Sequence, residues 1–349
     1  MKLSLLSIPF LAVLGSCGDP ATPNSEHAKT KTSADHDSAP AVKIPDSMLA
    51  AFGPLPAHYH TGEMPSEALI QLGRQLYYEP RLSSDNTVSC NSCHDLASFG
   101  VDGEPTSPGV GGSRGGRNSP TVYMAAGHIS QFWDGREPHV EAQAKGPILN
   151  PIEMAMPSAE DVEAKLAAIE GYVEGFTAAF PGESQPVNYD NLAIAIGSFE
   201  RGLVTPARWD EYLAGNKAAL SEAEKRGFLA FNKTGCQTCH MGPLLGGNMT
   251  QKLGLMRPWP ELEDQGIGDL TGTEAQNAFF KVPSLRNITQ TGPYLHDGSV
   301  ADLPEMVRLM AKYQLDKELT NGQIDDIVAF LGALEGTPDA AYIAKPALP

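Results

Sequence analysis

The feature that most constrains this chain is a pentad that occurs twice, as CNSCH at residues 90–94 and as CQTCH at residues 236–240. Cys-x-x-Cys-His is the attachment signature of c-type haem, in which two thiols add to the porphyrin vinyl groups and the His binds the iron. A thioredoxin-type disulfide would need an alternating β-α pattern, and a zinc site would not need two separate pentads that each end in His. The sequence therefore predicts two covalently bound haem c groups.

Each pentad supplies two thiols and a proximal iron ligand. The members are Cys90, Cys93 and His94 in the first pentad and Cys236, Cys239 and His240 in the second. The fifth cysteine of the chain is Cys17, so this assignment leaves no pair for a structural disulfide. Haem is attached to such proteins on the far side of the bacterial inner membrane, so we expect the chain to be exported.

The N-terminus carries the pattern of an export signal. One Lys is followed by the apolar run LSLLSIPFLAVL, which is too short to span a bilayer. LGSC at residues 14–17 resembles a lipobox, the motif at which a lipoprotein signal is cleaved. Cleavage there leaves Cys17 as a lipid-bearing N-terminus. The alternative is an ordinary secretory signal that leaves Cys17 free. We expect a signal peptide at 1–16, a lipidated disordered tether at 17–47, and a location on the periplasmic side of a bacterial membrane, lipid-anchored or else soluble.

The formal net charge of −17 excludes nucleic acid as a partner. An acidic surface of this kind could steer a basic redox partner, or it could serve only solubility. No other stretch is apolar enough to span a membrane, so we expect membrane contact only through the N-terminal lipid.

The rest of the pattern is helical with long loops, which predicts a mainly α fold. Apolar residues at helical spacing and capping signals predict helices within residues 65–80, 160–176, 189–203, 221–235 and 322–334. A helix leads into each pentad, so we expect two cytochrome c-like domains, at 48–205 and 206–349, packed around a shared interface. The loops at 100–121 and 241–283 show no period.

The function of each haem depends on whether its iron has a second axial ligand. A haem with a second axial ligand only carries electrons, whereas an open haem can bind a small ligand such as peroxide. After the second pentad the candidate ligands are Met241, Met249, Met256, Met306 and Met310. After the first pentad they are Met124 and His128. Peroxide cleavage also needs a group that moves a proton, and Glu153 is one of several acids here, with Asp134, Glu137 and Glu141.

Residues 65–335 resemble the bacterial dihaem cytochrome c peroxidases, a family that also contains the MauG-type enzymes. The matching stretches follow in family order and spacing; they include EPRLSSDNTVSCNSCH, RNSPTV, QFWDGR, QAKGP, GCQTCH, PSLRN, TGPYLHDG and LPEMVRLM. The resemblance implies that the N-terminal domain is peroxidatic and the C-terminal domain transfers electrons.

The resemblance also implies roles for individual residues. Glu153 matches the catalytic acid–base, Gln143 its hydrogen-bonding companion, and Trp133 the aromatic residue between the two haems. Met310 matches the distal ligand of the second haem. MauG-type enzymes carry Tyr as that ligand, so Met310 favours a peroxidase over an oxidase that modifies a protein partner.

Two further features follow from the resemblance. Asn118, Thr291 and Pro293 match a calcium site, for which side-chain and backbone oxygens are suitable ligands. Many family members carry a loop His that caps the peroxidatic iron in the oxidised enzyme, but the matching residue here is Val110 and the loop at 100–121 contains no His. We therefore expect the first iron to be open in the fully ferric protein.

The sequence thus predicts a periplasmic peroxidase that reduces hydrogen peroxide to water with electrons from a small soluble cytochrome c or cupredoxin. The alternatives are a MauG-like oxidase and a dihaem electron carrier without enzyme activity. The sequence leaves a homodimer open.

Overall fold

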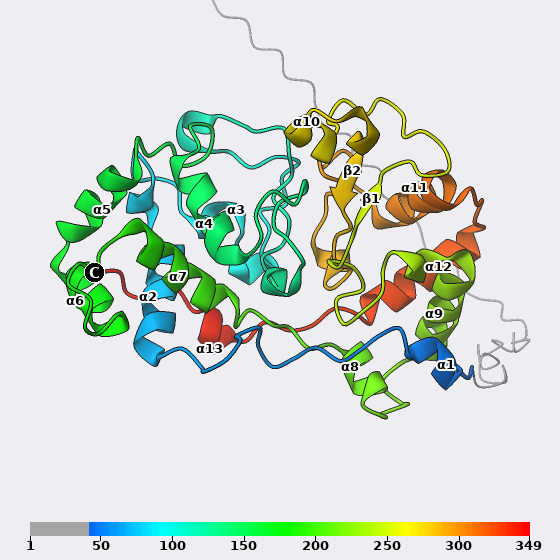
Figure 1. The fold of residues 1–349 in the computed structure, drawn as a ribbon. Coiled ribbons are helices and arrows are strands. Elements are labelled where there is room, and N and C mark those ends of the chain that lie inside the picture. Colours follow the sequence, from blue (N-terminus) through cyan, green and yellow to red (C-terminus); the bar gives the residue numbers. More distant parts are fainter. Residues whose placement is uncertain (1–41) are drawn as a thin grey trace, which may run out of the picture. The chain divides into compact units, whose positions relative to one another are not determined.

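The computed structural model describes residues 42–349, so the predicted signal peptide, the lipid attachment predicted at Cys17 and most of the predicted tether lie outside the described residues. The described part is mostly helical with little sheet, which confirms the mainly α prediction (Figure 1). No helix within residues 42–349 has both the length and the hydropathy of a membrane span.

The helices and strands have the following bounds. In the first part of the chain the helices are Asp46–Leu49 (α1), Glu67–Tyr77 (α2), Cys90–Cys93 (α3), Val140–Leu149 (α4), Ala159–Ala167 (α5), Glu170–Ala179 (α6) and Tyr189–Glu200 (α7). The later helices are Arg208–Leu213 (α8), Glu222–Thr234 (α9), Ile267–Thr271 (α10), Leu303–Leu315 (α11), Asn321–Gly332 (α12) and Ala340–Ile343 (α13). The strands Thr250–Lys252 (β1) and Phe279–Lys281 (β2) pair antiparallel, with Thr250 opposite Lys281.

The helix that precedes each pentad crosses a later helix at a glycine. A Cβ on Gly73 of α2 would lie 1.8 Å from the backbone oxygen of Ala195 in α7. A Cβ on Gly227 of α9 would likewise lie 1.8 Å from the backbone oxygen of Asp326 in α12. Both crossings therefore bring two helix backbones closer together than any residue with a side chain allows.

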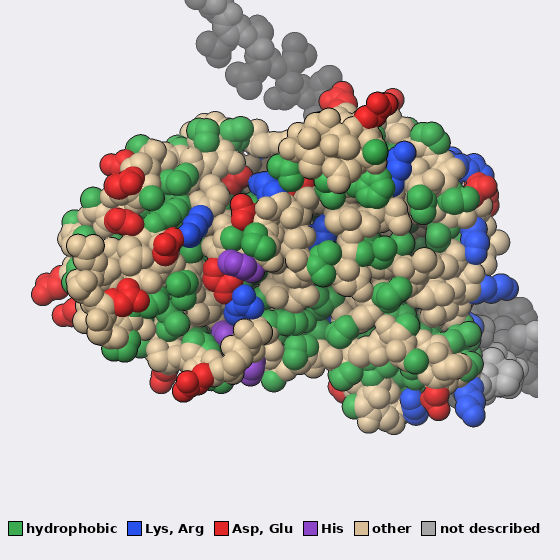
Figure 2. Space-filling view, viewed as in Figure 1, with side chains coloured by type: hydrophobic (Ala, Val, Ile, Leu, Met, Phe, Trp, Pro, Cys, Tyr) green, Lys and Arg blue, Asp and Glu red, His purple; other side chains and the backbone are tan. Residues whose placement is uncertain are grey.

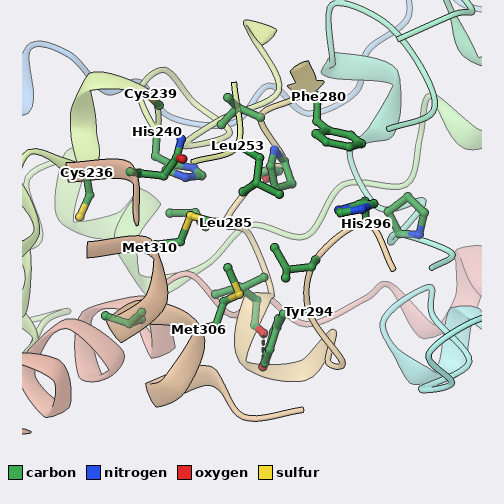
Figure 3. A pocket seen from close by; sticks show the side chains of 18 of the residues that line it. Cys236, Cys239, His240, Leu253, Phe280, Leu285, Tyr294, His296, Met306 and Met310 are labelled. Carbon is green, nitrogen blue, oxygen red and sulfur yellow. Dashed lines mark hydrogen bonds between the residues drawn. The ribbon is translucent and has the colours of Figure 1, made fainter. Parts of the chain in front are cut away.

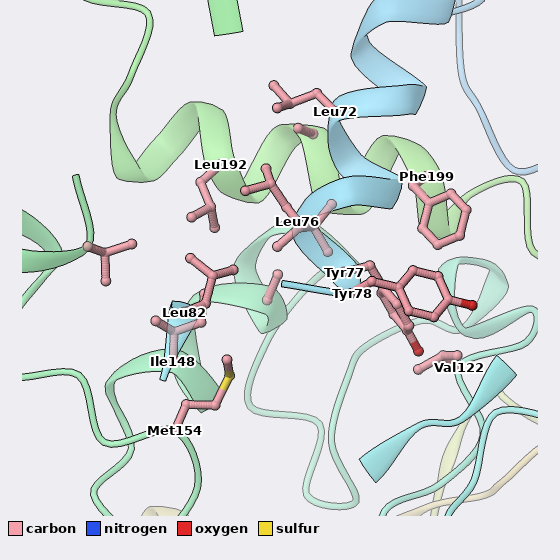
Figure 4. Packing of buried hydrophobic residues seen from close by; sticks show 14 of the residues in the cluster. Leu72, Leu76, Tyr77, Tyr78, Leu82, Val122, Ile148, Met154, Leu192 and Phe199 are labelled. Atoms are coloured by element: carbon pink, nitrogen blue, oxygen red, sulfur yellow. The ribbon is translucent and has the colours of Figure 1, made fainter. Parts of the chain in front are cut away.

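The first hydrophobic cluster lies around the crossing of α2 and α7. Leu72, Leu76 and Tyr77 of α2 are buried against Leu192 and Phe199 of α7 (Figure 4). Complete burial of such a side chain stabilises the fold by about 1.5–3 kcal/mol relative to exposure. This cluster forms the base on which the first pentad rests.

The second cluster is aromatic and lies around the crossing of α9 and α12. Trp209 of α8 packs against Phe228 of α9, with ring centroids 5.0 Å apart, and Phe228 packs against Phe330 of α12 at 5.2 Å. Such ring pairs stabilise the fold by about 0.5–1.5 kcal/mol beyond the effect of the buried area.

The N-terminal end of the described chain packs on the second hydrophobic cluster, and the C-terminal end packs on the first. Phe52 belongs to the second cluster, whereas Tyr342 packs against the first and donates a hydrogen bond to the backbone oxygen of Phe199 at 2.8 Å. Between these ends, the change from one cluster to the other falls between Leu203 and Trp209. The domain limits at 48–205 and 206–349 stay a prediction.

Two local predictions need correction. The helix expected at 160–176 is interrupted at Ala168 and Ile169, and the chain continues as a second helix. In one straight helix Tyr172 would point about 120° away from Leu166, and the interruption allows both side chains to be buried. The stretch 241–283, expected to be irregular, contains β1, β2 and α10, which are too short to produce a periodic pattern.

We predict that Gly227→Ala destabilises the protein by about 1–3 kcal/mol or more, because the new methyl group collides with the backbone of α12. The control is Gly322→Ala, also in this helix pair, where an added Cβ meets nothing within 4 Å and helix propensity favours Ala by up to about 1 kcal/mol. Urea unfolding followed by circular dichroism measures both. Equal midpoints for the two variants would contradict the close crossing.

Candidate functional site

The first pentad forms the short helix α3 and its C-terminal flank. The Ser89 and Ser92 side chains form a capping box at the start of this helix. The buried hydroxyl of Tyr77 donates a hydrogen bond to the backbone oxygen of His94 at 2.7 Å. The pentad is therefore tied to the first hydrophobic cluster through α2, which supplies Tyr77.

The second pentad begins directly at the end of α9. Gly235 ends this helix in the left-handed conformation, with φ of 101°, and a single 3-10 turn over Cys236–Thr238 follows. Nδ1 of His240 lies 3.0 Å from the backbone oxygen of Leu245, a contact that places the ring proton on Nδ1. The lone pair of Nε2 is then available for a metal, as in other His ligands held by a backbone carbonyl.

The imidazoles of both pentads suit an axial iron ligand. Burial lowers the pKa of His94 and of His240, which keeps both rings neutral at physiological pH. Among the described residues, Nδ1 of His94 has no hydrogen-bond partner. The chemistry of the residues therefore fits two covalently attached haem groups, which Cys90, Cys93 and His94 and their counterparts in the second pentad would hold.

A cavity of about 230 Å³ adjoins the second pentad. Cys236, Cys239 and His240 line it, and Met306 and Met310 of α11 extend into it (Figure 3). Leu253 and Phe280 are among the apolar residues that complete the lining, which suits the faces of a porphyrin. The geometry brings both methionines to the cavity, so the choice of Met310 over Met306 as iron ligand stays a prediction.

Glu153 lies close to the first pentad, in the turn that follows α4. The Asn150 side chain donates a hydrogen bond to Oε1 of Glu153 at 2.9 Å. Burial raises the pKa of Glu153, against the opposing effects of Asn150 and the Arg136 charge. Burial also raises the pKa of the Cys93 thiol, and the Glu153 charge adds to that rise, which indicates that the carboxylate is near the first haem attachment site. An acid with a raised pKa suits proton transfer near neutral pH.

The loop that carries Val110 is docked on the segment that contains Glu153. The backbone N–H of Val110 donates a hydrogen bond to the backbone oxygen of Glu153 at 2.8 Å. A Cβ on Gly109 would lie only 1.9 Å from the backbone oxygen of Ile152, so glycine is required at this approach. The loop and the predicted catalytic acid therefore form one unit.

Trp133 lies at the cavity of the second pentad. Its indole N–H donates a hydrogen bond to the backbone oxygen of Asn118 at 2.9 Å, and its ring meets His296 edge to face at 6.5 Å between centroids. Asn118, Thr291 and Pro293 line the same cavity. The described residues contain no group of three or more His, Cys, Asp or Glu that could hold a metal ion, so the calcium site stays a prediction that depends on amide and backbone oxygens.

The remaining sequence candidates lie in different surroundings. Gln143 is half-buried on α4, and no hydrogen bond joins it to Glu153. Met124 is fully buried in the first cluster, where the Thr205 hydroxyl lies 3.8 Å from its sulfur. His128 was a candidate ligand of the first iron, but its ring lines the cavity of the second pentad.

Lys281 is a residue of this cavity that the sequence did not reveal. It is only 6% exposed, and its Nζ lies 3.0 Å from Nδ1 of His128. Burial lowers the pKa of Lys281 to about 8, and burial together with the Lys281 charge lowers that of His128 well below its usual value. A lysine in the strand sequence FFK normally faces solvent, so no sequence signal marks it.

Comparison with known proteins identifies the family. The sequence pattern of the family described as di-haem cytochrome c peroxidase matches residues 67–218. Over a longer span, the chain is 40% identical to the cytochrome c551 peroxidase of Pseudomonas aeruginosa across 318 residues, which cover 88% of this chain and 91% of that protein. This chain belongs to the di-haem cytochrome c peroxidase family. The resemblance inferred from the motifs is confirmed, and membership of this di-haem family implies two haem c groups.

Other relatives span both branches of the di-haem peroxidase family. The chain is 42% identical to the cytochrome c551 peroxidase of Nitrosomonas europaea over 284 residues, or 80% of this chain and 83% of that one. It is 33% identical to the methylamine utilization protein MauG of Methylorubrum extorquens over 294 residues, or 80% and 81%. A solved MauG-like protein associated with microbial copper homeostasis is 29% identical, with a TM-score of 0.74 over 84% of this chain and 97% of that one.

We predict that Met310→His lowers the higher of the two haem reduction potentials, because a thioether ligand favours ferrous iron more than an imidazole does. Redox titration of the purified protein measures this potential. Met306→His is the matched control, since Met306 lies on the same helix and in the same cavity. If only Met306→His lowers the potential, Met306 is the ligand and the assignment of Met310 is wrong.

Proposed function

We propose that the protein is a periplasmic dihaem peroxidase that reduces hydrogen peroxide to two waters, with two electrons from a small cytochrome c or cupredoxin. The observation that carries this proposal is the half-buried carboxyl of Glu153, with its raised pKa, beside the first pentad. Relatives named cytochrome c peroxidase, at 39–42% identity over most of the chain, support it.

The residues around Glu153 perform the proton transfer in this proposal. A haem held by Cys90, Cys93 and His94 would supply the iron and the route by which electrons reach the peroxide. Glu153 takes the proton from one peroxide oxygen and returns it to the other, which leaves as the first water. The remaining oxygen becomes the second water with two electrons from the donor and two protons from solvent. The Asn150 amide holds Oε1 of Glu153 in one orientation, and Gln143 is proposed to assist from α4.

Electrons are proposed to enter at the second haem and to reach the first through the region of Trp133. A thioether ligand from Met310 would give a haem at the second pentad the higher potential that an electron acceptor needs. Trp133 lines the cavity beside the second pentad, and its indole N–H donates a hydrogen bond to the backbone oxygen of Asn118. The segment at Asn118 leads to Tyr123, which belongs to the first hydrophobic cluster. This position supports Trp133 as the link between the two centres.

The charged side chains are unevenly distributed over the face that Figure 2 shows. Asp and Glu gather over α5 and α6, and Lys and Arg are more frequent, among other acids, toward the end that holds α9 and α11. Ion pairs offset several of these basic side chains: Lys225 with Glu222, Arg226 with Asp326 of α12, and Arg308 with Glu305. The net charge of −17 therefore remains the basis on which a basic donor is expected.

Two finer features, a lipid anchor and a calcium site, belong to the proposal. A lipid on Cys17 would hold the enzyme at the periplasmic side of the membrane. A calcium ion would bind the side-chain oxygen of Asn118 and the backbone oxygens of Thr291 and Pro293.

Two alternative functions are less consistent with these residues. Met310 disfavours the MauG-like oxidase, and a first iron that is open, as predicted, would disfavour the electron carrier. A homodimer is compatible with the proposal but no part of it depends on one.

We predict that Glu153→Gln retains both haems but lowers kcat for peroxide reduction by about 10²–10⁴-fold, because the amide cannot carry the proton. A steady-state assay with a reduced donor measures kcat. Glu160→Gln is the control, since Glu160 is an exposed acid of α5. A Glu153→Gln variant within a factor of about two of Glu160→Gln would assign proton transfer to another group.

We predict that the fully ferric protein reacts with peroxide without prior reduction. Val110 is aliphatic, and its loop is fastened to the backbone of Glu153, so this loop offers the first iron no imidazole. Electron paramagnetic resonance is expected to show a high-spin ferric signal that disappears on mixing with peroxide. Two low-spin signals, with no reaction until one electron is added, would disprove this. Val110→His is expected to move the protein toward that gated behaviour.

A further inference from the structure

Within the part of the chain that the structure describes, Lys281 is a buried cation without a partner anion. Among residues 42–349, no Asp or Glu oxygen lies within salt-bridge distance of its Nζ, which contacts Nδ1 of His128 at 3.0 Å. The carboxylate whose charge acts on Lys281 is that of Asp134, and this group is already paired with Arg117 at 2.6 Å and Arg136 at 3.0 Å. Burial of an unpaired ammonium group is costly.

His128 is a second donor without a partner at the same place. Because the ammonium group of Lys281 donates to Nδ1, the ring proton lies on Nε2, and this buried atom has no hydrogen-bond partner among the described residues. His128 and Lys281 both line the cavity that contains Cys236, Cys239 and His240. An ammonium group and an imidazole N–H therefore adjoin the space beside the second pentad, and both require an acceptor.

The backbone holds this pair of donors in a fixed place. The N–H of Lys281 donates to the backbone oxygen of Trp133 at 2.8 Å, and Lys281 is paired with Thr250 in the two-stranded sheet. A Cβ on Gly247 would lie 2.4 Å from the His128 ring, so the absence of a side chain there leaves room for the imidazole. Neither donor can easily turn toward solvent.

We propose that Lys281 and His128 bind the two propionate carboxylates of the haem attached to the second pentad. The proposal rests on the dihaem function proposed above. A carboxylate is the acceptor that each donor lacks. Because Lys281 contacts the Nδ1 edge of the His128 ring and Nε2 lies on the opposite edge, each donor would bind a different one of the two propionates. When Lys281 and His128 bind the propionates, the negative charge of these groups is compensated and stabilises ferric iron less. The reduction potential of the second haem is therefore higher.

The test is a redox titration of the holoprotein and its Lys281→Met, Lys281→Arg and Lys252→Met variants. Lys252 is the matched control, because it lies on the paired strand and is exposed. We expect the higher potential to fall in Lys281→Met, to be largely retained in Lys281→Arg, and to stay unchanged in Lys252→Met, while the lower potential stays unchanged in all three. An equal effect of Lys281→Met and Lys252→Met on the higher potential would overturn the proposal.

A second pair of variants keeps the test decisive if Lys281→Met fails to assemble. His128→Gln retains a donor and is expected to keep the higher potential, whereas His128→Leu is expected to lower it. Added inorganic phosphate distinguishes a propionate from a free anion: a potential of the unsubstituted protein that changes with phosphate concentration would overturn the proposal. Haem quantification comes first, because unsubstituted protein with fewer than two haems contradicts the dihaem function itself.

Discussion

The close contact between two helix backbones at a glycine is the interaction on which each half of the structure depends. At Gly227 the absence of a Cβ lets α9 lie directly on α12. This fixes the end of α9, where Gly235 turns the chain and the second pentad begins. At Gly73 the same contact between α2 and α7 places Tyr77, which holds the backbone of His94. The position of each haem ligand thus follows from a helix crossing.

The two pentads share this base but differ in what surrounds them. The first is accompanied by a carboxylate, Glu153, and by a loop whose Val110 is bound to the backbone of that acid. The second is accompanied by thioethers, aromatic rings and the buried pair of Lys281 and His128. The first setting suits proton transfer to a small substrate, whereas the second suits the storage of an electron. A peroxidase that receives electrons singly requires both.

Local features of the fold were predictable from the sequence because their causes are local. The capping signals that predicted helices within 65–80 and 221–235 lie at Ser66, which caps α2, and at Ser221 and Glu224, which form the capping box of α9. The break between α5 and α6, the pairing of β1 with β2 and the contact of Lys281 with His128 depend on residues distant in sequence, and no short pattern marks them. The pentads revealed the haem ligands, but not the residues that surround each haem.

The most direct test of the account is the stoichiometry of the reaction. Purified protein with two haems is mixed in catalytic amount with limiting hydrogen peroxide and an excess of reduced small cytochrome c, and donor oxidation is followed by absorbance. The account predicts that two donor molecules are oxidised for each peroxide consumed, as the reduction of hydrogen peroxide to two waters requires. Loss of peroxide without donor oxidation, or no loss of peroxide at all, would contradict it.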